Sequence, residues 1–229
     1  LATSLLLAAC GGGDDGGDDA SSTPPPVGSA LNAGAGSPTG AEGSCSATTA
    51  GVNWNALMTE VCLKLSDYNL FADATDPTAG PTRGGVPYDL STALFSDYTS
   101  KYRFIFVPEG KTVSYNPSEV LDFPVGTVIT KTFALPANTA MRDGEELVIE
   151  TRLLIHRTDG WFALPYYWSS DSDATLTIAG KRLTGLTTIN NQGQQITFDY
   201  AVPKAADCSS CHSIVPDLAG SGDEREQIF

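Results

Sequence analysis

The stretch LVIETRLLIHRTDGWFALPYYW, residues 147–168, decides the fold. Leucine, β-branched and aromatic residues fill both of its halves, and the Asp159-Gly160 pair between them is typical of a hairpin turn. Alternation along the first half predicts two strand faces. One face carries Ile149, Thr151, Leu153 and Ile155, and the other carries Glu150, Arg152, Leu154 and His156. We therefore expect two antiparallel strands, at residues 147–156 and 161–168.

Segments of the same character lie on both sides of this stretch. They are residues 103–107, 127–135, 175–179 and 194–202. Gly, Pro, Asn and Asp separate them, and no long helical pattern interrupts the series. The sequence predicts a mainly β fold, either an antiparallel β-sandwich or an open barrel.

A short helix is expected ahead of the strands, over residues 53–67. Its apolar residues recur at helical spacing. They are Trp54, Leu57, Met58, Val61 and Leu65. Asn53 is suited to cap the start of this helix. Cys62 lies beside the apolar face, and we expect it to form a disulfide with Cys45 in an oxidising compartment. Two buried thiols are the alternative.

The most specific functional signal in the chain is the sequence Cys208-Ser209-Ser210-Cys211-His212. The C-x-x-C-H spacing is the attachment signature of a c-type haem. Two thiols at this spacing reach the two vinyl groups of one porphyrin, and the adjacent imidazole becomes the proximal ligand of the iron. A redox dithiol, half of a zinc site and a local disulfide are the alternatives. No βαβ pattern surrounds Cys208, no second ligand pair for zinc is present, and a disulfide leaves His212 unexplained, so we expect one covalent haem c on Cys208, Cys211 and His212.

The N-terminus has the character of an export signal. Residues 1–9 form an apolar run that is too short to span a bilayer, which takes about 20 residues. The run ends in Leu7-Ala8-Ala9-Cys10, which is similar to a bacterial lipoprotein signal. We expect Cys10 to be lipidated and to anchor the chain to a membrane. A chance cysteine after an ordinary signal peptide is the alternative, and the missing initiator Met indicates a clipped start.

Composition separates a tether from the folded part. Residues 11–44 are rich in Gly, Asp, Ser, Pro and Ala, and we expect a disordered tether there. The formal net charge of the whole chain is −14. This charge would repel nucleic acid and favours a basic or neutral protein partner. The expected organisation is a signal over residues 1–10, the tether over 11–44, a helix plus β-domain over 45–202 and a haem-attachment segment over 203–229.

The order of motifs between residues 65 and 212 resembles a family of bacterial exported di-haem c-type cytochromes, whose physiological role is largely unassigned. The motifs are VPYDLSTALFSDY at residues 86–98, KYRF at 101–104, FPVGTV at 123–128, KTF at 131–133, ETRLL at 150–154, Trp161, PYYW at 165–168 and the C-x-x-C-H sequence. The resemblance implies haem on Cys208 and Cys211, ligated by His212, after a non-haem N-terminal region.

The chain departs from that family after His212. Residues 213–229 are too few to enclose a haem, and no second C-x-x-C-H follows, so we expect a truncated start of a cytochrome c-like region. The candidate distal ligands within the chain are Met58, Met141 and His156.

These observations favour an electron-transfer protein of the periplasm or cell envelope, anchored to the membrane by lipid. The alternative is a lipid-anchored β-sandwich binding module with a vestigial haem segment. The feature that supports a binding module is the high density of aromatic residues at Trp161, Phe162, Tyr166, Tyr167 and Trp168. A haem enzyme using Glu150, Arg152 and His156 is a third possibility, although such a set on one strand more often forms a solvated surface or a structural ion pair.

Overall fold

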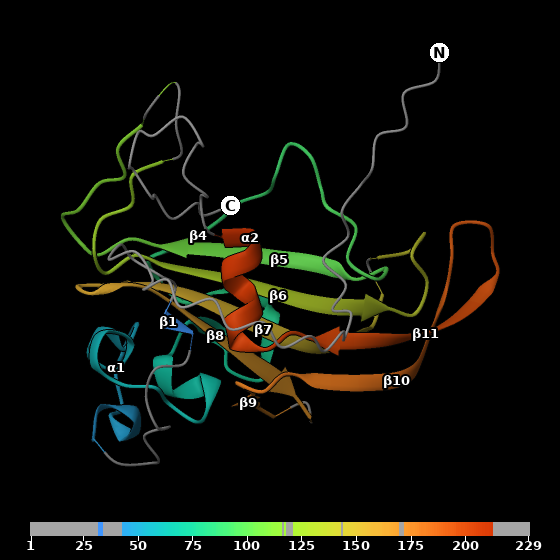
Figure 1. Cartoon of the computed structure of the whole chain (residues 1–229), viewed down its shortest axis with the longest axis horizontal. Coiled ribbons are helices and arrows are strands. Elements are labelled where there is room, and N and C mark those ends of the chain that lie inside the picture. Colours follow the sequence, from blue (N-terminus) through green and yellow to red (C-terminus); the bar gives the residue numbers. More distant parts are fainter. Residues whose placement is uncertain are drawn as a thin grey trace, which may run out of the picture.

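The computed structural model describes Asn32–Ala33 and residues 43–212, except for residues 116, 118–120, 143 and 170–171. Within this part of the chain the fold is mainly β, as predicted. Antiparallel sheets dominate, helical segments are short, and no sheet closes into a barrel. Figure 1 shows the strands running side by side, with short helices on both sides of the main sheet.

The main sheet is a meander that grows outward from the predicted hairpin. Strands β7 (Glu146–Arg157) and β8 (Gly160–Trp168) form the hairpin, and β6 (Val128–Pro136), β5 (Ser100–Phe106) and β4 (Gly85–Pro87) follow in order on the β7 side. On its other side β8 pairs with β9 (Ala174–Leu176) and, in parallel, with β1 (Asn32–Ala33). The hairpin turn is one residue earlier than expected, because Arg157 pairs with Gly160 across Thr158 and Asp159.

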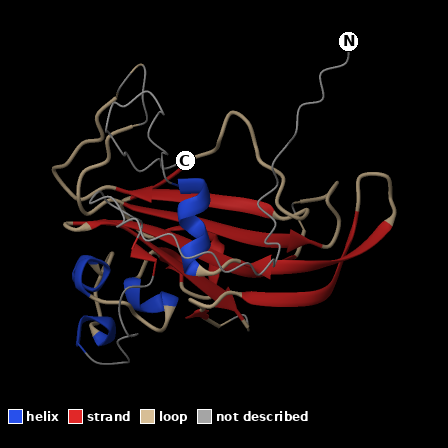
Figure 2. Ribbon diagram, in the orientation of Figure 1, coloured by secondary structure: helices blue, strands red, loops and turns tan. Residues whose placement is uncertain are grey.

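Two smaller hairpins complete the β structure (Figure 2). They are β2 (Phe71–Asp73) with β3 (Asp76–Pro81), and β10 (Lys181–Ile189) with β11 (Gln195–Val202). The sequence predicted β11 but not β10. Strand β10 is largely exposed and is interrupted at a register shift where Gly185 has a φ of 71°, so it lacks the apolar alternation by which strands are recognised.

The expected helix over residues 53–67 was wrong in extent. It divides into α1 (Trp54–Thr59) and the 3-10 turn η2 (Leu65–Tyr68). Asn53 caps α1 as predicted, accepting from the backbone N–H of Ala56 at 3.2 Å. Glu60 is extended and ends the helix, and Lys64 then pairs with Thr175 at the edge of the sheet. Three further helical segments are η1 (Gly43–Ser46), η3 (Ala205–Cys208) and α2 (Ser209–His212).

The main sheet has two covered faces. On the helix-covered face, residues of α1, η1 and η2 pack against side chains of β5 to β8 and form the largest apolar cluster. On the opposite face, which we call the motif face, two smaller clusters lie at opposite ends, and the C-x-x-C-H segment packs against one of them. The motif face is defined by Ile129, Lys131, Arg152, Leu154 and Ala163.

Strand β7 corrects one expected side-chain direction. Thr151, Leu153 and Ile155 face the helices, but Ile149 belongs to a cluster on the motif face with Leu135. A bulge is the reason: Phe133 pairs with Glu150 and Ala134 with Val148, so Ile149 is an extra residue and the alternation is reversed there.

The predicted Cys45–Cys62 disulfide is formed and joins η1 to the segment after α1. Both cysteines are buried, and their Cα atoms are 5.6 Å apart. Arg157 of β7 adds a second connection, since its guanidinium donates to the carbonyls of Leu57 (2.7 Å) and Glu60. The disulfide and Arg157 together fix the helical segment against the sheet.

Removing the disulfide is expected to lower the free energy of unfolding by about 3 kcal/mol, because it closes a loop of sequence separation 17. The variant with Cys45→Ala and Cys62→Ala, compared with wild type by urea denaturation, measures this loss. Added reductant should destabilise wild type toward the variant and leave the variant unchanged. Equal denaturation midpoints for the two proteins would contradict this role of the bond.

The signal at residues 1–10, with Cys10, lies outside the described residues, as do residues 213–229 and most of the expected tether. Of that tether the structure describes Asn32–Ala33, which pair with β8, and Gly43–Ser44, which begin η1. Within the described part of the chain, no helix has the length and apolar character needed to cross a bilayer.

Candidate functional site

The C-x-x-C-H motif lies in one short helical run that crosses the motif face (Figure 1). Cys208 ends η3, and α2 continues through Cys211 to His212. Residues three and four positions apart share one face of a helix, so this run presents both thiols and the imidazole on one side. Sequence spacing and local structure therefore agree on a single three-residue site.

A backbone contact with the turn after β9 and a local side-chain contact hold the start of this run. The Ala205 N–H donates to the carbonyl of Ile178 at 2.9 Å, and the Lys204 N–H donates to Asp207 Oδ2 at 3.0 Å. Gly180 makes the close approach possible: it has a φ of 72°, and a Cβ there would lie 2.7 Å from the Val202 carbonyl oxygen. These contacts fix the position of the motif relative to the end of β11.

The residues present at this place fit the requirements of a covalent haem. Both cysteines are present as thiols; Cys208 is half-buried and Cys211 is exposed. Cys208 packs against an apolar cluster on β6, β7 and β8. Burial raises the pKa of the Cys208 thiol, and the nearby charge of Arg152 opposes that rise. Accessible thiols beside an imidazole are what thioether attachment and proximal ligation need.

The sheet beneath the motif is built in two parallel rows of opposite character. The cross-strand register aligns Ile105, Ile129, Leu154 and Ala163 in an apolar row. Three residues of this row, Ile129, Leu154 and Ala163, form with Phe123 and Trp161 the buried cluster against which Cys208 packs. Two residues along each strand, about 7 Å away, the register aligns Arg103, Lys131 and Arg152. We call these three residues the cationic row.

Like charges directly opposite one another on a sheet are destabilising, yet the cationic row has little compensation. Arg103 is 6% exposed, and its carboxylate partner Asp89, at 3.5 Å, is 91% exposed. Among the described residues, no carboxylate lies within ion-pair distance of Lys131. Its ammonium instead lies 5.0 Å from the centre of the Phe133 ring, which also receives the Arg152 guanidinium at 4.4 Å.

Among the residues that the structure describes, Glu150 is the one buried carboxylate beside the row. It is fully buried and accepts from Arg152 Nε at 2.9 Å and from a second Arg152 nitrogen at 2.6 Å. The hydroxyl of buried Tyr200, from β11, donates to Glu150 at 2.5 Å. Burial, followed by the charge of Glu150, raises the pKa of Tyr200, which keeps its proton available for this bond.

The position of Lys131 in the cationic row destabilises the charged form of its side chain. Burial, and then the charges of Arg152, Arg103 and Lys101, lower the pKa of Lys131 from 10.5 to about 8, while Glu150 acts weakly in the opposite direction. Since the unfolded chain holds this proton more tightly, the free energy of unfolding rises with pH between about 8 and 10.

In the haem-free protein, Lys131→Gln should therefore raise stability near neutral pH, by about 1 kcal/mol, the scale of a like-charge cross-strand pair. Urea denaturation of wild type and variant at pH 7 and at about pH 9.5 measures the difference, which should shrink at the higher pH as wild-type Lys131 loses its proton. A variant less stable than wild type at pH 7 would show that Lys131 stabilises the fold instead.

The three polar residues singled out on β7 do not act as one group. Glu150 and Arg152 form the ion pair described above, which is the structural alternative for this set. His156 stacks on Trp161, with ring centres 4.5 Å apart, and its Nδ1 lies 2.9 Å from the carbonyl oxygen of Phe123. His156 thus contacts two members of the apolar cluster against which Cys208 packs, and not the carboxylate of Glu150.

The candidate distal ligands differ in position. Met58 is in α1, which packs against the opposite face of the sheet, and Met141 is 64% exposed in a loop. Of the three, His156 lies on the motif face and stacks on Trp161, a member of the cluster against which Cys208 packs.

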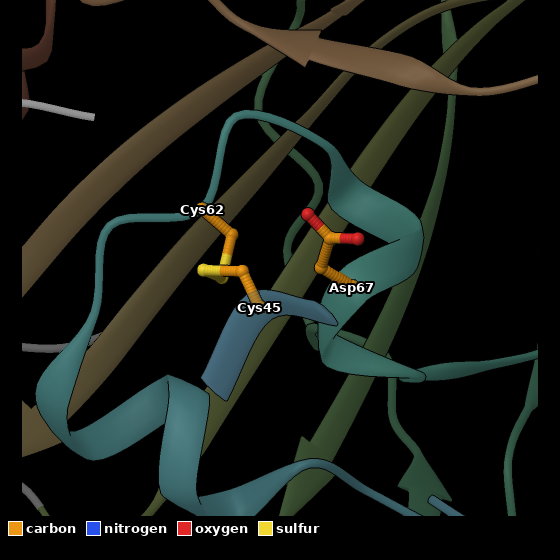
Figure 3. A group of neighbouring side chains, drawn as sticks. All are labelled: Cys45, Cys62 and Asp67. Carbon is orange, nitrogen blue, oxygen red and sulfur yellow. A yellow bond between two sulfur atoms is a disulfide. The ribbon is translucent and has the colours of Figure 1, made fainter. Parts of the chain in front are cut away.

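A group of possible metal ligands elsewhere is explained by the disulfide. Figure 3 shows Cys45, Cys62 and Asp67, whose ligand atoms lie within 4.8 Å of one another. Because the two sulfur atoms are bonded to each other, they have no thiolate to offer a metal. Burial raises the pKa of Asp67, and Asp173 adds to the rise.

The aromatic residues between 161 and 168 pack in or against the three apolar clusters of the fold. Trp161, Phe162, Tyr166 and Trp168 are buried, and Tyr167 is half-buried. A binding module would need several of them exposed in a shallow groove, so their burial removes the observation that favoured this alternative.

Comparison with known proteins yields no relative: neither a protein-family model, nor a curated protein, nor a solved structure matches this chain. The site is therefore defined by its own residues, as a C-x-x-C-H motif lying on a mainly antiparallel sheet. The sequence alone did not reveal the cationic row, although each of the segments KYRF, KTF and ETRLL places a cation inside a strand pattern.

Proposed function

We propose that this chain is a c-type haem protein that transfers electrons in the bacterial cell envelope. Cys208 and Cys211 hold the haem, and His212 is the proximal ligand of its iron. The carrying observation is the helical run at Cys208–His212, in which Cys208 packs on an apolar cluster of the sheet and Cys211 is exposed. A sandwich-like β-domain followed by the start of a cytochrome c-like region is the finer architecture that we propose.

Haem attachment requires mainly that the protein position the two thiols and the imidazole. Each thiol adds across one vinyl group: a carbon–sulfur bond forms, the thiol proton passes to the neighbouring carbon, and no oxidant or reductant is consumed. The bound iron supplies one-electron chemistry between its two oxidation states. The chain supplies the two thiols, the imidazole, and the charge and burial that tune the potential.

Charge and compartment support an exported electron carrier. The net charge of −14 favours a basic or neutral redox partner in a weak, salt-sensitive encounter. The Cys45–Cys62 disulfide is compatible with an oxidising compartment. The lipoprotein-like sequence ending at Cys10 and the resemblance to exported di-haem cytochromes agree with that location and suggest a lipid anchor.

Visible absorption spectroscopy tests the proposal. The full chain, produced with haem-maturation machinery, should be coloured and should interconvert between reduced and oxidised spectra on addition of dithionite and ferricyanide. His212→Ala, which keeps both thiols, should retain the haem but change its axial ligation and spectrum. A colourless wild-type protein would overturn the proposal.

A further inference from the structure

We propose that the cationic row receives the propionate carboxylates of the haem held at Cys208 and Cys211, with Lys131 and Arg152 as the binding residues. This inference rests on the proposed function and assigns to the β-domain a part in the haem site. Arg103 contributes charge from the far end of the row, where its side chain is buried and its carbonyl accepts from the Tyr88 N–H at 3.2 Å.

The first step of the argument is position. Cys208 packs on the apolar cluster that contains Leu154, and Arg152 lies two residues from Leu154 on the same face of β7. The cationic row begins there with Arg152 and runs across β6 to β5, a span of two interstrand spacings, or about 10 Å. A porphyrin carries its vinyl and propionate groups on opposite edges. Cations that extend away from the attachment thiol are therefore placed for the far, carboxylate-bearing edge.

The second step is charge. The row holds three cations against one buried carboxylate, Glu150, in a chain where acidic residues outnumber basic ones by 27 to 13. Placing like charges in direct register has a cost that an anion would remove. Burial, and then the like charges of Arg152 and Arg103, lower the pKa of Lys131. Two carboxylates arriving together would bring the local charge of the row and Glu150 from +2 to neutral.

The third step is access and geometry. Lys131 is half-buried, and the Arg152 side chain is 29% exposed, so both can reach a ligand on the motif face. Glu150 fixes the Arg152 guanidinium through two of its nitrogens and leaves the third without an assigned acceptor among the described contacts. A planar guanidinium held in this way is suited to bind a further carboxylate.

Resonance Raman spectroscopy of the purified haem-loaded full chain tests the inference, because the propionate bending bands report on hydrogen bonding and ion pairing of these carboxylates. Lys131→Gln should shift the bands toward those of solvent-exposed propionates. Lys131→Arg, which keeps the charge, should leave them close to wild type. The matched control is Lys181→Gln, since Lys181 is exposed on β10 and its ammonium also lies over an aromatic ring, 4.7 Å from the centre of Tyr167.

The outcomes separate this inference from the proposed function. A wild-type chain without covalent haem ends both. A haem-loaded chain whose propionate bands do not change in Lys131→Gln overturns the inference and leaves the haem assignment standing. Shifted bands in both Lys131→Gln and Lys181→Gln also overturn it, because a general loss of positive charge would then be the cause. Misfolding is excluded as the origin of a band shift if the haem-free Lys131→Gln variant has a urea denaturation midpoint no lower than that of haem-free wild type.

Discussion

Replacing Glu150 with alanine is expected to lower the free energy of unfolding by about 3 kcal/mol or more, the scale of breaking a buried ion pair by removing one partner. Three losses combine. Arg152 loses a bidentate partner, the buried hydroxyl of Tyr200 loses its acceptor, and the cationic row loses its one buried counter-charge. Urea denaturation at neutral pH measures the effect.

Two further variants test the origin of the destabilisation: one is a milder substitution of Glu150, and the other is a control at an exposed ion pair. Glu150→Gln keeps one acceptor oxygen, which can still receive the Tyr200 hydroxyl, but removes the charge and the second acceptor for Arg152, so its destabilisation should be smaller than that of Glu150→Ala. Asp199→Asn breaks the exposed pair between Arg182 and Asp199, at 3.0 Å, and should change the midpoint little. An unchanged midpoint for Glu150→Ala would show that Glu150 is not the counter-charge that the motif face needs.

Replacing both motif cysteines with serine is expected to abolish covalent haem. Cys208→Ser or Cys211→Ser alone leaves one thiol, and hence one thioether bond, whereas the double variant leaves none. Haem staining of the denatured protein after electrophoresis, normalised to protein amount, measures attachment. The double variant should fall to background.

The chain offers a matched control in its other two described cysteines. Cys45→Ala with Cys62→Ala removes two sulfur atoms as well, but on the opposite side of the sheet, where they pack in the helix-covered cluster. Haem staining of this control should equal that of wild type for the same amount of folded protein. Equal loss of haem in both double variants would mean that attachment fails through instability and not through missing thiols.

The sequence predicted the main sheet because each of its long strands carries its own signal. Residues 147–156 and 161–168 combine apolar alternation with a turn, and the structure forms β7 and β8 there. The helix over residues 53–67 was overextended because its apolar spacing continues past Glu60, where the chain becomes extended. Burial of Val61 and Leu65 is achieved by a turn instead of a helix, and spacing cannot distinguish the two.

The motif was visible in the sequence, but its surroundings were not. Five consecutive residues specify a C-x-x-C-H motif without any knowledge of the fold. The cationic row depends on the pairing of β5 with β6 and of β6 with β7, and single strands do not contain that register. The bulge at Ile149 illustrates the same limit, because strict alternation places Ile149 on the wrong face.

The most direct test of the account is the mass of the motif peptide from mature protein made by a haem-maturation-competent host. Trypsin should release residues 205–225, which contain Cys208, Cys211 and His212 and lie between Lys204 and Arg225. The account predicts that this peptide carries the added mass of one haem, and that no other peptide does. Recovery of the peptide at its unmodified mass, with both thiols still open to alkylation, would contradict it.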